Sequence, residues 1–259
     1  MRRRLALQLG LMPGLLPTAQ AQPQPLVLRS ASQAGFAHKY NPGGTGPQGF
    51  CIEYIQALKR LEPSLDFTGL QEVLPTLRIE QDLAAGRIDV FFAMLKTPER
   101  EALFRFADSP RIYTIFHHIA VLATDVQAEQ VRSFGDLRAL GSDGRVLTTK
   151  GSGYAAFLRE QVGLDVDDGA TALDQNLRKL VSARARFLYD SESSLQRAIQ
   201  AQGLQAQVRI LPTVFRRQDL LLAYAPGLAP ERLARLLAAM RALEASGVAA
   251  RLRAAYGLS

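Results

Sequence analysis

The segment of residues 89–101, DVFFAMLKTPERE, joins an apolar run to a polar turn that carries an unusual arginine. Thr97 followed by Pro98 predicts a helix start, because a hydroxyl caps the first N–H groups and proline suits the first helical position. A capping box would place Glu or Gln at the third helical position, where this chain has Arg100. A cation there opposes the helix dipole. The planar guanidinium of Arg100 can bind a carboxylate with two hydrogen bonds. The alternative is that Arg100 faces solvent and that the glutamates beside it offset its positive charge.

Two other turns carry polar groups where α/β proteins commonly bind ligands. Lys150, Gly151 and Ser152 lie between a predicted strand and a predicted helix, so backbone N–H groups and a hydroxyl can form an anion cradle there. An ordinary strand-to-helix turn is the alternative. Asp190 ends a predicted strand, at the edge where open α/β sheets place ligand-binding groups, and it is also suited to cap the next helix.

Several familiar chemistries are not indicated. The segment GTGPQG, residues 44–49, contains G-x-G-x-x-G, but about a dozen residues separate it from the preceding predicted strand, Pro42 precedes it and Pro47 interrupts it, so we interpret it as a loop. The three histidines, His38, His117 and His118, show no metal-ligand spacing with acids or cysteine. Cys51 is the single cysteine and lies at helical spacing from apolar residues, which predicts a buried thiol. We therefore expect no metal and no organic cofactor.

The first 21 residues are typical of a secretory signal peptide. Three arginines precede a short apolar run, and the run is followed by Ala-Gln-Ala, a small-x-small cleavage pattern. The formal net charge of the full chain is +7, and removal of those three arginines would leave 7 − 3 = +4. This modest charge is not clustered as nucleic-acid binding requires, and no other run approaches the ~18 apolar residues of a membrane span. We predict an exported protein that binds no nucleic acid.

Strand-like and helix-like segments alternate along the rest of the chain, which predicts an α/β fold. The pattern gives a strand near Leu26, a helix over residues 50–63, a strand over Ile88–Met94 after a helix capped by Gly86, and a strand over residues 117–124. Residues 82–95 and 179–192 resemble each other in a helix end, an arginine and an apolar strand. Two similar lobes would produce this repeat, and so would chance.

An ordered set of short motifs resembles the family 3 extracellular solute-binding proteins, the periplasmic receptors for amino acids and similar polar solutes. The resemblance covers nearly the whole mature chain. Its pieces are GFCIEY (49–54), LAAGRID (83–89), TPER (97–100), FADSPRIY (106–113), KGS (150–152) and a C-terminal run from AYAPG to AYG (223–257).

This resemblance implies a type II periplasmic-binding-protein fold, in which two α/β lobes are joined by two hinge strands and close on a ligand. Lobe 1 would comprise residues 26–111 and 216–259, and lobe 2 residues 112–215. The family pattern implies that Arg100 holds the α-carboxylate of the ligand and that Gly151 and Ser152 donate to the same group. Asp190 would accept from an α-amine, and Phe36 would form an aromatic wall.

The chain departs from the family pattern at three places. Cys51 replaces the first acid of the GFCIEY motif, Leu95 stands where Thr or Ser commonly helps to bind the carboxylate, and Arg186 stands where Asp is usual in the second lobe.

Four cations near the expected cleft favour a more anionic ligand. They are Arg78, Lys96, Arg100 and Lys150. The alternative is that Arg78 and Lys96 face solvent.

By this resemblance, we expect a monomeric periplasmic protein that binds a small carboxylate-bearing solute and delivers it to an ABC permease in the inner membrane. Two alternatives remain open. The same fold supports periplasmic dehydratases of cyclohexadienyl acids, and it supports ligand sensors that act on a membrane signalling partner.

Overall fold

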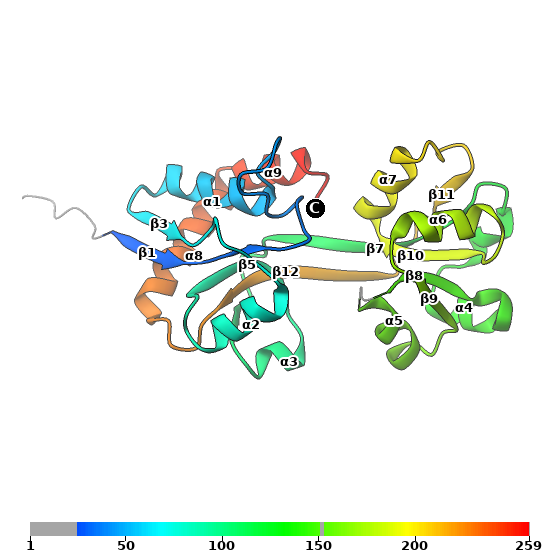
Figure 1. Ribbon diagram of the computed structural model, residues 1–259, viewed down its shortest axis with the longest axis horizontal. Helices are drawn as coiled ribbons and strands as arrows, with labels where there is room; N and C mark the ends of the chain where they lie inside the picture. Colours follow the sequence, from blue (N-terminus) through cyan, green and yellow to red (C-terminus); the bar gives the residue numbers. More distant parts are fainter. Residues whose placement is uncertain (1–24, 151–152, 259) are drawn as a thin grey trace, which may run out of the picture.

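Two α/β lobes joined by two long strands make up the described part of the protein. The computed structural model describes residues 25–150 and 153–258 (Figure 1). The predicted signal peptide lies outside this part, as do Gly151 and Ser152. Within the described residues, no helix combines the length and the apolar character that crossing a membrane requires.

Lobe 1 is built from both ends of the chain. Its N-terminal strands and helices are β1 (Leu26–Arg29), β2 (Ser32–Gln33), α1 (Phe50–Leu61), β3 (Leu65–Thr68), β4 (Val73–Leu74), α2 (Thr76–Ala84), β5 (Val90–Leu95), α3 (Pro98–Glu101) and β6 (Arg105–Ala107). Its C-terminal helices are α8 (Pro230–Ala245) and α9 (Val248–Ala255). Two short parallel pairs, β1 with β3 and β2 with β4, complete the lobe.

Lobe 2 is formed by the middle of the chain. Its strands are β8 (Val146–Thr149), β9 (Val166–Ala170), β10 (Phe187–Ser191) and β11 (Val208–Ile210). Its α-helices are α4 (Phe134–Ala139), α5 (Tyr154–Ala156), α6 (Leu173–Val181) and α7 (Glu192–Ala201). Two 3₁₀ helices, η1 (Val126–Gln130) and η2 (Gly141–Gly144), and the π-helical turn η3 (Phe157–Gln161) complete it.

The crossing strands β7 (Tyr113–Leu122) and β12 (Arg216–Tyr224) run from one lobe into the other (Figure 1). They belong to one sheet of order β5-β12-β7-β10-β8-β9, with β6 on β12 and β11 on β7. The strand that we expected to begin at His117 begins four residues earlier, at Tyr113, because its first residues pair with β12. Strand β5 begins at Val90, two residues later than expected.

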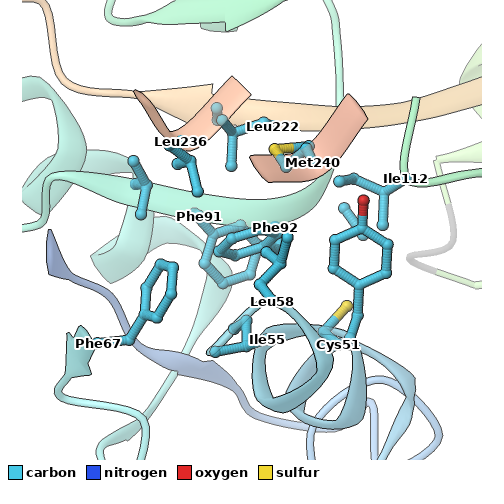
Figure 2. Close-up of a cluster of buried hydrophobic side chains, with 14 of the residues drawn as sticks. Cys51, Ile55, Leu58, Phe67, Phe91, Phe92, Ile112, Leu222, Leu236 and Met240 are labelled. Carbon is cyan, nitrogen blue, oxygen red and sulfur yellow. The ribbon is translucent and has the colours of Figure 1, made fainter. Parts of the chain in front are cut away.

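Each lobe has its own buried apolar side chains. In lobe 1, α1 contributes Cys51, Ile55 and Leu58 to a core that faces Phe91 and Phe92 of β5 (Figure 2). The predicted burial of the Cys51 thiol is confirmed. The lobe 1 core draws on residues 26–113 and 220–249, whereas two clusters in lobe 2 draw on residues 119–211. These memberships support our proposal that the lobes divide at 26–111 plus 216–259 and 112–215.

The internal repeat has the same backbone pattern in both lobes. After α2, the N–H of Gly86 donates to the carbonyl oxygen of Leu83, and Gly86 has a φ of 67°. After α6, the N–H of Ala183 donates to the carbonyl oxygen of Leu180, and Ala183 has a φ of 54°. Each helix is thus ended by one residue in the left-handed region before its strand begins, but lobe 2 uses an alanine where lobe 1 has the favoured glycine.

A charge-reversed ion pair explains the departure at Arg186. In lobe 1, Asp89 accepts hydrogen bonds from the guanidinium of Arg29 at 3.0 and 2.7 Å. In lobe 2, the guanidinium of Arg186 donates to both oxygens of Asp125 at 2.9 and 3.0 Å. Arg186 thus takes the place of Asp89 before its strand, and it forms an ion pair within lobe 2 with Asp125, the residue that caps η1.

We expect Ala183→Gly to stabilise the protein by up to about 1 kcal/mol. The left-handed conformation costs an L-residue about 1–2 kcal/mol, and the greater unfolded-state entropy of glycine offsets part of that gain. The matched change is Gly86→Ala, which should lower the free energy of unfolding. A Cβ at Gly86 would meet no atom within 4 Å, so its cost is conformational. Urea unfolding of both variants measures the effect, and a loss of stability in Ala183→Gly would contradict this explanation.

Candidate functional site

The end of β5 carries the predicted arginine of lobe 1. The predicted helix cap is confirmed, because the Thr97 hydroxyl accepts a hydrogen bond from the Arg100 N–H at 3.4 Å and Pro98 begins α3. The Arg100 side chain is 21% exposed, its Nε donates a hydrogen bond to one Glu80 oxygen at 2.9 Å, and its Nη2 lies 2.9 Å from the same oxygen in an ion pair. A third nitrogen donates to the carbonyl oxygen of Leu95 at 2.8 Å.

Glu80 of α2 therefore pairs with Arg100 and fixes its orientation, rather than the glutamates next to Arg100 in the sequence. The two hydrogen bonds use two of the five N–H donors of a guanidinium, and three remain for a ligand. Because Glu80 is only 17% exposed, this ion pair is largely shielded from water and holds the guanidinium in one orientation.

The other predicted cations of lobe 1 are paired with acids. Lys96 lies 3.0 Å from oxygens of both Glu101 and Asp108. The Arg78 guanidinium lies 3.0 Å from a carboxylate oxygen of Asp82, one helical turn along α2. These pairs lie near the surface and offer little net positive charge to a ligand.

The aromatic candidate, Phe36, lies in the loop between β2 and α1 and is 42% exposed. Its ring centroid lies 6.1 Å from that of His38 and 5.4 Å from the Lys39 ammonium. An exposed ring beside a cation can pack against the apolar part of a small ligand.

In lobe 2, Asp190 lies near the end of β10 and is only 8% exposed. One of its oxygens accepts a hydrogen bond from the Ser191 N–H at 2.7 Å, while burial raises the pKa of the Asp190 carboxyl to about 6. Ser191 itself caps α7, since its hydroxyl accepts from the Ser194 N–H. The alternative that Asp190 caps this helix is therefore wrong, because the cap is the next residue.

Lys150 follows β8 at the same edge of the sheet and is exposed. Its backbone N–H donates to the carbonyl oxygen of Ala170 at 2.8 Å. The proposed anion cradle of Gly151 and Ser152 lies outside the described residues.

Sequence reasoning missed an aromatic cluster in lobe 2. The ring of His117 stacks on that of Tyr189 at 5.4 Å, and the Arg216 guanidinium lies 3.7 Å above the Phe157 ring. The His117 ring nitrogens and the Tyr189 hydroxyl are buried, with no hydrogen-bond partner among the described residues. No pattern in the sequence indicates this cluster, since His117 and Arg216 are brought together only by the pairing of β7 with β12.

Among residues 25–150 and 153–258, no group of three or more His, Cys, Asp or Glu could hold a metal ion. A small pocket between the lobes is lined by both of them and by the first residues of β7. Its lining includes His38, Thr114, Ser191, Arg197 and Leu258.

We expect Asp190→Asn to stabilise the protein at neutral pH. A carboxyl whose pKa rises from 3.8 to about 6 on folding contributes stability that is fully present below pH 3.8 and is lost as pH rises through 6. About two pKa units correspond to roughly 3 kcal/mol at most. Asparagine retains the oxygen that accepts from Ser191 and cannot ionise.

Urea unfolding at pH 7.5 and pH 4 measures this effect. The variant should exceed the wild type in stability at pH 7.5 and match it at pH 4. Asp143→Asn, a change at an exposed acid of the same lobe, is the control and should have little effect at either pH. Destabilisation by Asp190→Asn at both pH values would contradict an ionisation cost at this site.

No family model matches the chain, and no curated protein sequence matches it. Solved structures match it over most of its length. The probable amino-acid ABC transporter extracellular-binding protein ytmK from Bacillus subtilis is 16% identical, with a TM-score of 0.68 over 90% of this chain and 98% of that one. The unliganded, open L-cystine solute receptor of Neisseria gonorrhoeae is 17% identical, with a TM-score of 0.64 over 89% of this chain and 92% of the receptor.

A third match is the ancestral amino-acid-binding protein AncCDT-1, described as a precursor of cyclohexadienyl dehydratase. It is 20% identical, with a TM-score of 0.61 over 89% of this chain and 95% of that one. At these identities the likeness concerns the fold. The chain has the two-lobed, periplasmic-binding-protein-like α/β fold, and its structural neighbours include amino-acid-binding solute receptors.

Proposed function

We propose that the protein binds a small carboxylate-bearing solute, an amino acid or a related compound, between its lobes and delivers it to an ABC permease. One observation carries the proposal: Arg100 and Asp190 lie at the ends of strands that flank the crossing pair from opposite lobes. Leu95 of β5 is opposite Leu220, and Leu220 is opposite Tyr113 of β7. Asp190 of β10 is opposite His118, five residues further along β7.

Five residues of extended chain span roughly 17 Å at about 3.4 Å each. The two strand ends are therefore separated by a gap, which a hinge motion of the lobes would narrow. A zwitterionic ligand would join the two sides, with its carboxylate on the remaining donors of Arg100 and its ammonium on Asp190. Phe36 would pack against its apolar part, and Gly151, Ser152 and Lys150 would contribute donors from lobe 2.

The partner and the location follow from the likeness to extracellular binding proteins. The Bacillus protein is described as part of an amino-acid ABC transporter, and the gonococcal protein as a solute receptor. Together with the predicted signal peptide, these support a periplasmic binding protein, which we propose acts as a monomer without a cofactor.

A second candidate function is dehydration of a cyclohexadienyl acid. It is favoured by the raised pKa of Asp190, because a buried carboxyl that titrates near pH 6 can exchange a proton with a substrate. The likeness to AncCDT-1 adds to it. Incubation of the protein with prephenate or arogenate and detection of the aromatic product would distinguish catalysis from binding.

We expect a thermal-shift screen of the mature protein to identify a carboxylate ligand, and Arg100→Ala to abolish the shift. A ligand at one hundred times its dissociation constant adds about 2.7 kcal/mol to the free energy of unfolding. The screen would contain amino acids, dicarboxylates, polyamines and aromatic acids. Each shift is compared with the ligand-free melting temperature of the same variant, because Arg100→Ala also leaves Glu80 without its partner.

Arg60→Ala is the matched control, since Arg60 is exposed near the end of α1. A shift that persists in Arg100→Ala would exclude this arginine as the carboxylate-binding group. A screen in which only polyamines bind would contradict the proposed ligand class.

A further inference from the structure

Lys39 is a buried cation of lobe 1 that no carboxylate balances among the described residues. The residue is only 6% exposed. Its ammonium donates to the side-chain oxygen of Gln33 at 2.7 Å and to the carbonyl oxygen of Ala93 at 2.9 Å. Both acceptors are neutral, and buried charges in proteins are normally paired with an opposite charge.

The surroundings of Lys39 add no negative charge. Ring centroids of Phe36, Tyr40 and Phe91 lie 5.4, 5.9 and 5.8 Å from its ammonium. Burial, together with the positive charge of Arg100, lowers the pKa of the Lys39 ammonium to about 8. The two cations donate to carbonyl oxygens only two residues apart on β5, those of Ala93 and Leu95, and Glu80 balances Arg100.

The backbone is strained where it meets this ammonium. Ala93 has a φ of 58° in the middle of β5, and the pairing of β5 with β12 is irregular at this point. The left-handed region is unfavourable for a non-glycine residue, and such strain concentrates at functional sites. The carbonyl oxygen of this strained residue is the one that Lys39 contacts.

A chain of polar contacts leads from Lys39 toward α2. The side-chain nitrogen of Gln33 donates to the Thr76 hydroxyl at 2.7 Å, and Thr76 is the first residue of that helix. The exposed ring of Phe36 covers the ammonium from the loop side. Lys39 is therefore linked through Gln33 to the helix that carries Glu80, and its ammonium lies 5.4 Å from the centroid of the partly exposed Phe36 ring.

We propose that Lys39 and Arg100 together form an anion-binding subsite of lobe 1, in which the Lys39 ammonium donates its third N–H to a carboxylate of the ligand. This inference rests on the proposed function, and it adds Lys39 to the residues proposed there to bind the ligand. The unbalanced positive charge of the lobe 1 site comes from Lys39, since Glu80 balances Arg100 and acids of their own hold Lys96 and Arg78.

The test compares Lys39→Met, Lys39→Arg and Lys59→Met in titration calorimetry with L-glutamate, L-aspartate, L-glutamine and succinate. Lys59 is the matched control, because it lies on the outer face of α1 and pairs with Asp66 at the surface. A charged hydrogen bond of the usual strength predicts about ten- to hundredfold weaker binding in Lys39→Met. Lys39→Arg should retain most of the affinity, and Lys59→Met should match the wild type.

Unchanged affinity in a folded Lys39→Met protein would overturn the proposal and leave Lys39 as a donor to strained backbone. If Lys39→Met fails to fold, Lys39→Gln retains a donor without the charge and should show the same loss of affinity; unchanged binding in it would equally overturn the proposal. If no carboxylate of the thermal-shift screen, including these four probes, binds the wild type, the proposed function fails together with this inference. That outcome differs from failure of the inference alone, in which wild type and variant bind equally.

Discussion

The antiparallel pairing of β7 with β12 is the constraint on which the arrangement of this protein depends. Five consecutive residue pairs, from Arg216 opposite His117 to Leu220 opposite Tyr113, hold the two strands in one register between the lobes. On one side β12 continues into its pairing with β5, and on the other β7 continues into its pairing with β10. The register therefore decides which residues of the two lobes face each other across the gap. A shift by one residue would turn every side chain of a strand to the opposite face.

Ion pairing decides which charges near the gap are available to a ligand. Lys96, Arg78 and Arg186 are each held by an acid of their own lobe. Arg100 is oriented by Glu80 and retains three donors. Lys39 and Asp190 differ from all of these, because each is buried and neither forms an ion pair among the described residues. Groups of this kind cost stability and are typical of binding sites, where a ligand supplies the missing charge.

The likeness to solved structures and the local chemistry contribute different information. Proteins with this two-lobed fold include receptors described for different solutes, so the fold itself does not select a ligand. We propose that selection depends on side chains such as Lys39, Phe36 and Asp190, which we have placed by their contacts. Because the paired surface charges largely cancel one another, these few groups would determine which ligand charge is favoured.

Local sequence was sufficient for the alternation of strands and helices, the cap at Thr97 and the left-handed residue at Gly86. These features depend on residues close in the chain, whose spacing a sequence displays directly. The same reasoning placed Arg100 after a strand but could not identify Glu80, its partner twenty residues away. It also gave no indication of Lys39, whose ammonium reaches Ala93, fifty-four residues along the chain. Burial and pairing of charges arise only when distant segments pack together, and so the tertiary structure alone decided which cations are free to bind a ligand.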